Sequence, residues 1–329
     1  MSSDRSVAGT KVYFREAVAR ALREEMRLNP RVLVLGQDVG AFGGSYREFE
    51  GLHAEFGSGR VRDTPVAEGA SIGISVGVAA SGFRPVVSIT YMDFLMLGFD
   101  PLINYAAKLR YKTGGLLTAP VVVKTTAGAL GQGVAHSQCI EAWLMGVPGL
   151  KVVAPSTPAD AYGLMKTALR CDGPVVYIDH KRLFPIPGEV ANTETFIPFG
   201  QAVVRKQGKD VTIVAHSFMV RIALDAARML EAENISAEII DLRSLAPLDV
   251  DSVAQSVDKT GALVTLEEGQ TTCGVGVEVA ARLHERMGAR PWTRVGALPA
   301  PVSSNPALEA ACVPNAARVA SATRLLLKR

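Results

Sequence analysis

A glutamate near the start of an expected helix could hold or deliver a proton. Glu68 falls in the first turn of a helix that Asp63-Thr64-Pro65 is expected to open. Its neighbours Val66 and Ala67 are small or apolar, so the carboxylate would be desolvated and its protonated form favoured. The same position also suits a carboxylate that merely interacts with the positive end of the helix dipole. The residues alone leave both roles open.

A histidine beside a Gly-rich segment is the best general acid/base candidate among the five histidines. His136 lies just after residues 128–133, and an imidazole can exchange a proton near neutral pH. A histidine that is hydrogen-bonded structurally to its own loop is the alternative. The weaker candidates are His53 and His284, in charged helices, and His180 and His216, at strand ends.

One short motif suggests a hydrolase. Gly73-Ile74-Ser75-Val76-Gly77 fits the G-x-S-x-G pattern of a nucleophile elbow, with Asp93 and His284 as conceivable partners. An elbow needs a hydrophobic strand immediately before it, whereas a helix is expected here, so the hydrolase interpretation is disfavoured. Glycines instead recur every four residues from Gly69 to Gly77 and leave one helix face nearly bare. This pattern predicts close packing against another helix, within the chain or between subunits.

Two Gly-rich segments, residues 36–44 and 128–133, follow expected strands. Neither is a phosphate cradle, because G-x-x-x-x-G-K-[ST] is absent and the second segment has the wrong glycine order for G-x-G-x-x-G. Loops at the carboxyl edge of an open α/β sheet are where ligands bind. We therefore expect both segments to be active-site loops.

The elements that must position these residues alternate between helix and strand. Apolar residues from Phe14 to Met26 recur at helical spacing, and Asn29-Pro30 ends that helix. Unbroken Val/Ile runs then predict a parallel sheet covered on both faces. The expected strands are residues 32–35, 86–89, 121–123, 151–153 and 175–178.

A polar stretch with several prolines interrupts this pattern from residue 184, and a second set of strands and helices follows it. The expected strands there are 211–215, 237–242 and 262–266, and the expected helices are 220–233, 250–259 and 275–286. The predicted fold is therefore α/β, with two doubly wound domains. The predicted boundaries are 1–186 for the first domain, 187–200 for a linker and 201–329 for a smaller second domain.

Composition excludes several classes of protein. Hydrophobic residues make up 48% and charged residues 20% of the 329, which excludes a disordered chain. A net charge of +3 without charged runs gives nucleic-acid binding no support. The four cysteines lie far apart and suit a reduced, cytosolic setting without zinc or disulfides. The longest apolar stretch is too short for a bilayer, and no targeting signal is evident, so we expect a cytoplasmic protein without a membrane partner.

Several motifs, taken in order, resemble one family. They cover nearly the whole chain, and their agreement is more specific than any single motif. The chain resembles the beta subunit of the thiamine-diphosphate-dependent decarboxylase component of 2-oxo acid dehydrogenase complexes, and its C-terminal half is similar to the transketolase C-terminal domain. The motifs are Leu35–Gly40, Phe42–Gly44, Arg62–Glu68, Gly82–Pro85, His136–Gln138, Pro148–Pro158 and Asp241–Asp249.

The resemblance implies roles for five residues. Glu68 would contact N1′ of the cofactor's aminopyrimidine and promote its imino tautomer. Phe94 would stack on the pyrimidine, and Val66 and Thr90 would form walls of the same pocket. His136 would face the substrate and transfer a proton, stabilise an oxyanion or assist the attack of a lipoyl group.

The cofactor's diphosphate is held in such enzymes by Gly-Asp-Gly and a later Asn, which also bind a divalent cation. This chain contains no Gly-Asp-Gly. The resemblance implies that an alpha subunit supplies the motif and its Mg²⁺ in an α2β2 heterotetramer. It also implies transfer of the acyl group to a lipoyl-bearing acyltransferase core, with the Gly69–Gly77 face packed at the subunit interface.

Four positions depart from the family pattern. Many relatives hold a structural K⁺ near residues 170–174 with acidic and Asn side chains, and Cys171 and Gly173 stand in those places here. This departure argues against the ion. Gln37 replaces a common acidic residue, and His216 replaces a common aromatic one.

The substrate expected from the resemblance is a 2-oxo acid. His136-Ser137-Gln138-Cys139, followed by Ala142-Trp143, is more similar to pyruvate or acetoin relatives than to branched-chain ones. The predicted function is thus that of a pyruvate dehydrogenase-type beta subunit. The alternatives are an acetoin or branched-chain beta subunit and a non-catalytic scaffold subunit that has kept the fold.

Overall fold

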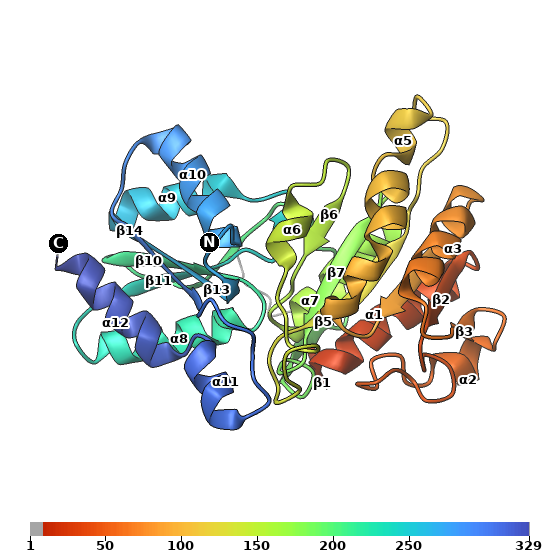
Figure 1. Cartoon of the computed structure of the whole chain (residues 1–329), viewed down its shortest axis with the longest axis horizontal. Helices are drawn as coiled ribbons and strands as arrows, with labels where there is room; N and C mark the ends of the chain where they lie inside the picture. The colour runs from red at the N-terminus through yellow and green to blue at the C-terminus, as the bar shows by residue number, and fades with distance from the viewer. Residues whose placement is uncertain (1–8, 329) are drawn as a thin grey trace.

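The computed structural model describes residues 9–328 and shows two α/β lobes side by side (Figure 1). The strands of the N-terminal half are β1 (Gly9–Tyr13), β2 (Val32–Gly36), β3 (Val61–Asp63), β4 (Arg84–Ile89), β5 (Val122–Ala127), β6 (Lys151–Val153), β7 (Val175–His180) and β8 (Pro187–Ala191). Its helices are α1 (Phe14–Leu28), α2 (Leu52–Phe56), α3 (Glu68–Ala80), α4 (Met92–Leu95), α5 (Leu109–Lys112), α6 (Glu141–Met145) and α7 (Pro158–Arg170), with the helical turns η1 (Met96–Gly98) and η2 (Asp100–Ala106).

The C-terminal half continues the alternation of strand and helix. Its strands are β9 (Val203–Lys206), β10 (Val211–Ala215), β11 (Ala237–Asp241), β12 (Ser244–Ala246), β13 (Leu263–Gln270) and β14 (Trp292–Ala297). Its helices are α8 (Met219–Glu231), α9 (Val250–Thr260), α10 (Val275–Met287), α11 (Pro306–Cys312) and α12 (Ala316–Leu327). Every strand and helix expected in this half is therefore present, within a few residues of its predicted bounds.

Each lobe is built on a mostly parallel sheet. The N-terminal sheet has the order β12-β6-β7-β5-β4-β2-β3, and only β12, at the edge, runs antiparallel to its neighbour. The C-terminal sheet has the order β14-β13-β10-β11-β9, with β9 antiparallel. The predicted α/β fold with two doubly wound units is confirmed.

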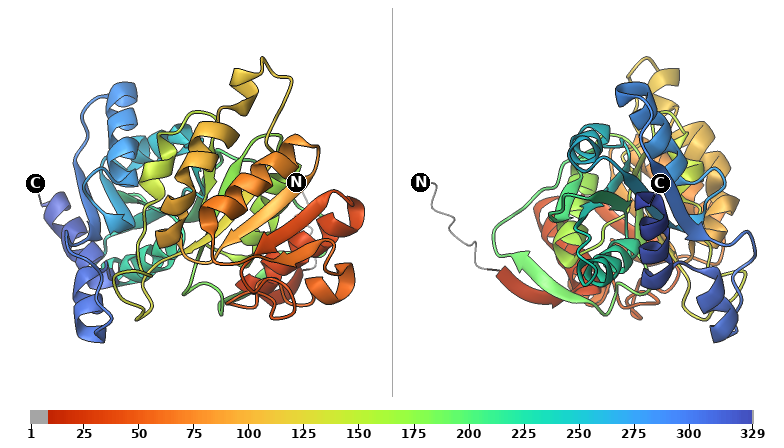
Figure 2. Two further views of the ribbon diagram at one scale, coloured as in Figure 1. Left: turned by 45° about the vertical axis from the view of Figure 1, so that its right-hand side comes forward. Right: turned by 90° about the vertical axis from the view of Figure 1, so that its left-hand side faces the viewer.

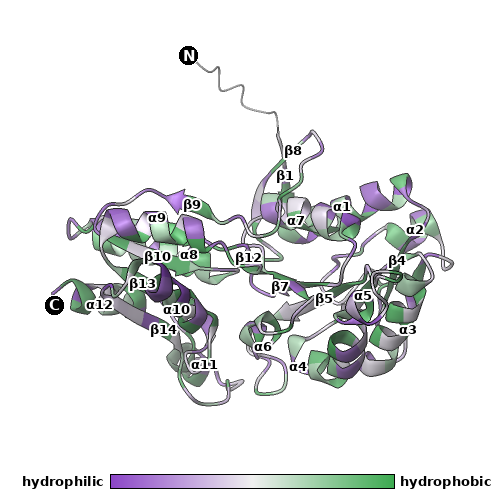
Figure 3. Cartoon of the chain, turned by 90° about the horizontal axis from the view of Figure 1, so that it is seen from above, coloured by the Kyte–Doolittle hydropathy of each residue, from purple (hydrophilic) through white to green (hydrophobic). Residues whose placement is uncertain are grey.

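Neighbouring valines on each central strand face opposite sides of the N-terminal sheet, because successive side chains of a strand point to alternate faces. Val86 and Val122 pack into a cluster with α1 and α7, whereas Val87 and Val123 pack into a cluster with α3. Figure 3 shows α1 and α7 on one side of this sheet and α3 and α4 on the other. The unbroken apolar runs in the sequence are therefore buried on both faces, as expected.

The lobes are not independent units. The fourth strand of the C-terminal half, β12, pairs with β6 and completes the N-terminal sheet. One buried apolar cluster also crosses the boundary, with Leu144 and Val152 on one side and Ala254 and Val275 on the other. The two halves consequently share one buried apolar cluster, although each also has a cluster of its own.

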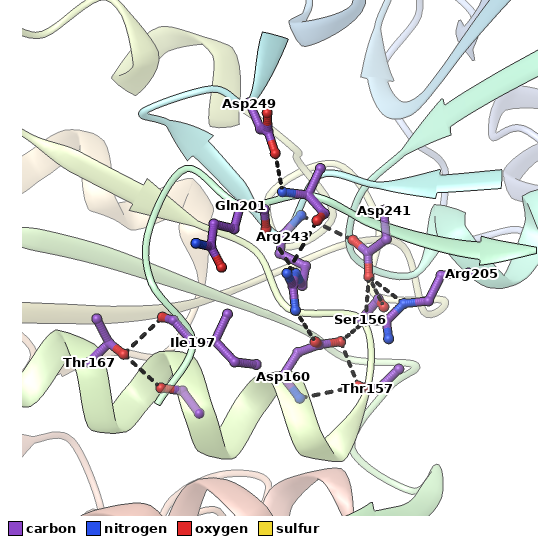
Figure 4. Close-up of polar contacts among 12 residues, drawn as sticks. Ser156, Thr157, Asp160, Thr167, Ile197, Gln201, Arg205, Asp241, Arg243 and Asp249 are labelled. Atoms are coloured by element: carbon purple, nitrogen blue, oxygen red, sulfur yellow. Dashed lines mark hydrogen bonds and ion pairs between the residues drawn. The ribbon is translucent and has the colours of Figure 1, made fainter. Parts of the chain in front are cut away.

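A buried ionic network reinforces this boundary (Figure 4). Asp241, at the end of β11, accepts a 2.5 Å hydrogen bond from the Ser156 hydroxyl and a 2.8 Å one from Arg205 Nη2. Arg205 also pairs with Asp160 of α7, which lies 3.4 Å from Arg243 Nη1. Burial raises the pKa of Asp241 above its ordinary value, and nearby Asp160 raises it further.

The segment expected to be a linker contains a strand. Strand β8 pairs antiparallel with β1, with Gly9 opposite Ala191, and this two-stranded ribbon lies at the margin of the molecule (Figure 2). Val190 is its buried contact with the core. The boundaries 1–186, 187–200 and 201–329 stay a prediction. Among residues 9–328, none of the helices combines the length and apolar character needed to cross a membrane.

The helix that bears Glu68 begins later than predicted. Asp63 ends β3, which pairs with β2, and its Oδ1 accepts a 2.7 Å hydrogen bond from the Gly40 amide. The prediction that Asp63-Thr64-Pro65 opens the helix is wrong, because this carboxylate binds a distant loop instead of capping a helix. Helix α3 starts at Glu68 itself, after Ala67, which offers no side-chain cap.

Candidate functional site

Glu68 lines a small recess at the carboxyl ends of β2 and β4. The residues that follow these two strands, Gln37 and Thr90, lie in its wall together with Ser71 and Ser88. Carboxyl ends of parallel strands are where open α/β sheets bind ligands. A half-buried carboxylate surrounded by hydroxyl and amide groups therefore occupies the expected binding edge.

The rim of this recess is open in the single chain. Val66 does not line the recess itself, but it lies between Pro65 and Ala67, which do. Its side chain is 79% exposed, which is unusual for a branched apolar residue. Glu68 is only partly buried, so the desolvation expected from its small neighbours is incomplete here. Removal of the remaining water requires another molecule or subunit to cover the rim.

Three rings meet next to the recess. The centroid of the Phe94 ring, on α4, lies 5.3 Å from that of the His136 ring, and the centroid of the Tyr91 ring lies 4.6 Å from it. Both pairs are in edge-to-face arrangement. Tyr91 directly follows Thr90, which lines the recess. The structure thus brings Phe94 and His136 into contact, and Glu68 and Thr90 into one recess beside them. Val66, expected as a wall residue, is exposed and does not line this recess.

A buried lysine that the sequence analysis did not single out supports the His136 loop. The Lys181 ammonium donates a 2.9 Å hydrogen bond to the Gly128 carbonyl, donates another to the His136 carbonyl, and lies 5.1 Å above the Tyr91 ring. Burial lowers the pKa of Lys181 from its ordinary value. Its partners lie about fifty positions away in the chain, so no local pattern in the sequence reveals this role.

The groups proposed for a hydrolase do not assemble. Ser75 is fully buried inside α3, and its hydroxyl donates to the Ser71 carbonyl at 2.8 Å. Asp93 is also buried and accepts a 3.2 Å hydrogen bond from the Gln138 amide. His284 lies exposed on α10, in the other lobe. The absence of a strand before Ser75 removes the nucleophile elbow, as predicted.

The other histidines have structural surroundings. His180 Nε2 lies 2.8 Å from Glu268 Oε2, and its Nδ1 accepts a hydrogen bond from the Arg182 amide, so Nε2 carries the hydrogen. Burial lowers the pKa of His216 to about 4, which keeps that ring neutral at physiological pH. His53 of α2 is partly exposed.

A cavity of about 490 Å³ lies between the lobes, beyond His136. Glu141 and Trp143 of α6 line one side, and Glu267 and Glu268 of β13 line the other. Burial raises the pKa of Glu141 to about 8, and the two glutamates opposite contribute further. No local pattern in the sequence indicates this cavity, because its walls come from segments more than 120 residues apart.

The glycine-rich face of α3 is partly covered by the same chain. A Cβ at Gly69 would stand 2.8 Å from the Leu97 carbonyl oxygen of η1, which confirms a close helix contact within the chain. A Cβ at Gly77 would meet no atom within 4 Å, and Gly77 is exposed. The far end of the face is therefore free in this chain.

The segment 170–174 is held by an arginine. Arg84 Nη1 donates to the carbonyls of Leu169 and Cys171 at 3.2 and 2.8 Å, and Nη2 pairs with Asp172 at 2.8 Å. No group of three or more His, Cys, Asp or Glu side chains within residues 9–328 could hold a metal ion. The doubt that Cys171 and Gly173 cast on a structural K⁺ at this segment is not tested by these contacts.

Comparison with known proteins identifies both lobes. Residues 10–187 match the model of the transketolase pyrimidine binding domain, and residues 200–319 match that of the transketolase C-terminal domain. A solved structure described as a split gene transketolase, inactive beta4 tetramer, superposes with a TM-score of 0.81 at 29% identity, covering 96% of this chain and 99% of that one.

Two relatives match the chain over most of its length. Pyruvate dehydrogenase E1 component subunit beta of Rhizobium meliloti is 42% identical, over 94% of this chain and 68% of the relative. Acetoin:2,6-dichlorophenolindophenol oxidoreductase subunit beta of Cupriavidus necator is 39% identical, over 97% of this chain and 98% of the relative. The chain therefore belongs to the family of transketolase-like beta subunits that includes the pyruvate dehydrogenase E1 and acetoin oxidoreductase beta subunits.

Proposed function

We propose that this chain is the beta subunit of a thiamine-diphosphate-dependent decarboxylase component that acts on a 2-oxo acid, with pyruvate as the substrate. The observation that carries the proposal is the Glu68 carboxylate at the carboxyl edge of the sheet, beside the Phe94 and His136 rings. The match to a pyrimidine binding domain and the relatedness to pyruvate dehydrogenase E1 beta subunits support it.

The residues present fit half of the cofactor. A carboxylate can bind a ring nitrogen, and a partly exposed aromatic ring can stack on a planar heterocycle. No Gly-Asp-Gly occurs in the sequence, so the diphosphate and its Mg²⁺ belong to an alpha subunit. Thiamine diphosphate, when bound, supplies the electron sink that decarboxylation of a 2-oxo acid requires.

Each residue of the chain then has a defined task. Glu68 exchanges a proton with N1′ of the aminopyrimidine, and a cover over the exposed Val66 side chain strengthens this contact by excluding water. Phe94 packs against the pyrimidine, and Thr90 limits the pocket on the side of β4. His136 supplies or takes a proton at the substrate, and its ring is oriented by Tyr91 and Phe94.

The open rim supports an α2β2 heterotetramer. Val66 and the free end of the α3 glycine face are exposed in this chain, and an alpha subunit that covers them also closes the recess over Glu68. The acyl product passes to a lipoyl group on an acyltransferase core. A second candidate is acetoin cleavage, because the acetoin oxidoreductase beta subunit matches 97% of this chain over 98% of its own length.

The test is co-expression with an alpha partner, followed by native mass measurement and assay with thiamine diphosphate, Mg²⁺ and an artificial electron acceptor. Pyruvate, branched-chain 2-oxo acids and acetoin are compared as substrates. We expect a heterotetramer that turns over pyruvate fastest. Preference for acetoin or a branched-chain acid would correct the substrate, and a complex that binds the cofactor without turning over any of them would mark a non-catalytic subunit.

A further inference from the structure

The loop that carries His136 is held from both lobes at once. Its amides point to the C-terminal lobe, where Glu268 accepts a 2.7 Å hydrogen bond from the Ala129 N–H and Glu309 accepts a 2.6 Å one from the Gly131 N–H. Its carbonyls point to the residues after β7. There Lys181 binds the carbonyls of Gly128 and His136, and Arg182 Nε binds that of Ala129 at 2.9 Å.

We propose that Glu309 is a positioning residue through which the C-terminal lobe sets the location of His136. The inference rests on the proposed role of His136 as the group that exchanges a proton at the substrate. It gives the C-terminal lobe a part in catalysis, although none of the residues expected to touch cofactor or substrate lies in that lobe.

The side chain of Glu309 is well suited to anchor the loop. It lies in the first turn of α11, whose N-cap is Asn305, and only 9% of the side chain is exposed. Its second oxygen accepts a 2.9 Å hydrogen bond from Arg182 Nη2. Arg182 in turn binds Ala129, so the carboxylate, the guanidinium and the loop form a closed ring of hydrogen bonds.

A packing contact supports the same attachment. Gly133 lies against Ser304, immediately before α11, and a Cβ at Gly133 would stand 3.3 Å from the Ser304 Cβ. The loop therefore touches the C-terminal lobe at three successive points, Ala129, Gly131 and Gly133. His136 follows the last of them by three residues, and its amide donates to the Gly133 carbonyl at 3.2 Å.

Glu309 is a better probe of this attachment than Glu268. Glu268 also pairs with His180, so its replacement would disturb a second buried group. Glu309→Gln keeps the size of the side chain but leaves one acceptor oxygen for two donors, and its amide N–H₂ faces the other donor. Glu309→Asp keeps the charge and shortens the reach, and serves as a second variant if the first does not fold.

The first measurement is amide hydrogen exchange on the full chain. We expect exchange in residues 129–136 to accelerate about tenfold or more in Glu309→Gln, because a hydrogen bond to a charged acceptor is lost. Exchange in α8 and β10 should not change. Glu233→Gln is the matched control, since Glu233 also pairs with an arginine, Arg324, on the same lobe but far from the loop. Unchanged exchange in residues 129–136 would overturn the proposal.

The second measurement is activity of the complex with the alpha partner, in single and double variants. We expect Glu309→Gln to lower kcat about tenfold or more and to shift its pH profile, with little change in cofactor affinity. In a His136→Ala background the same substitution should cost almost nothing further, since both act through one group. An equal fold-loss in both backgrounds would refute positioning of His136.

The two measurements separate this inference from the proposed function. If His136→Ala alone leaves activity intact, the catalytic role of His136 fails, whatever Glu309 does. If His136→Ala lowers kcat strongly while Glu309→Gln changes neither loop exchange nor kcat, the proposed function stands and the positioning role is wrong.

Discussion

The imidazole of His136 lies edge-on to the ring of Phe94, with the ring centroids 5.3 Å apart and the planes at 85°. Tyr91 contacts the same imidazole at 86° from another direction. Two perpendicular rings restrict rotation of the histidine without forming a hydrogen bond to its nitrogens. The imidazole is therefore oriented by packing, and within residues 9–328 neither of its nitrogens has a hydrogen-bond partner.

Replacement of Phe94 should affect cofactor and histidine together. In Phe94→Leu we expect the Kd for thiamine diphosphate to rise about tenfold, because an aromatic contact worth about 1 kcal/mol and part of the packing area are lost. We also expect kcat to fall, because His136 can then rotate. Binding is measured by calorimetry on the complex. An unaltered Kd would show that Phe94 does not touch the cofactor.

Replacement of Glu68 tests the proton transfer directly. Glu68→Gln keeps the size of the side chain and removes its ability to exchange a proton, so we expect kcat to fall by about 10² to 10⁴. The fold and the heterotetramer should persist, since Glu68 is only partly buried. Glu50→Gln, at an exposed position of the same lobe, is the control. Retained activity in Glu68→Gln would remove the central element of the proposed function.

The free end of the glycine face tests the subunit interface. Gly77→Gln should leave the single chain folded and about 0.5 to 1 kcal/mol more stable, because a helical glycine is replaced and a Cβ there meets no atom within 4 Å. We expect the heterotetramer to dissociate in native mass spectra. Gly59→Gln, at another open position, should assemble normally. Full assembly of Gly77→Gln would place the alpha subunit elsewhere.

Glu141 should make stability depend on pH. Its pKa is raised from 4.5 to about 8, so below pH 4.5 the folded and unfolded states are both protonated and the group has no effect on stability. Between pH 4.5 and 8 the unfolded state ionises first, and the free energy of unfolding falls. In Glu141→Gln the side chain does not ionise, so the free energy of unfolding does not fall for this reason. We expect this variant to be about 3 to 5 kcal/mol more stable than the wild type above pH 8.

The measurement for Glu141 is denaturant unfolding at pH 5 and pH 9. The free energy of unfolding of Glu141→Gln should exceed that of the wild type by a small amount at pH 5 and by a large amount at pH 9. Glu285→Gln, at an exposed position of α10, should show no such difference between the two values of pH. An equal stability of wild type and Glu141→Gln at pH 9 would mean that the Glu141 carboxyl reaches water.

Much of the fold follows from local pattern, and much of the site does not. The Val/Ile runs predict the central strands because both faces of a parallel sheet are buried. Glu68 is a candidate because it falls in the first turn of an expected helix, and His136 because it lies just after a Gly-rich loop. Lys181 and Glu309 are not predicted, because neither lies in a recognisable local pattern. Lys181 binds a loop about 50 positions earlier in the chain, and Glu309 binds the same loop 178 positions earlier. Strand β12 is hidden for the same reason, since three residues pair with a strand some 90 positions earlier.

The pairing of β12 with β6 has a consequence for how the chain can be divided. If the polypeptide were cut near residue 200, the N-terminal fragment would lose β12 and present the bare backbone of Lys151–Val153 at the sheet margin. Unpaired strand edges invite association with other chains. The N-terminal fragment alone would consequently tend to self-associate or aggregate, and addition of the C-terminal fragment would suppress this by restoring the missing strand.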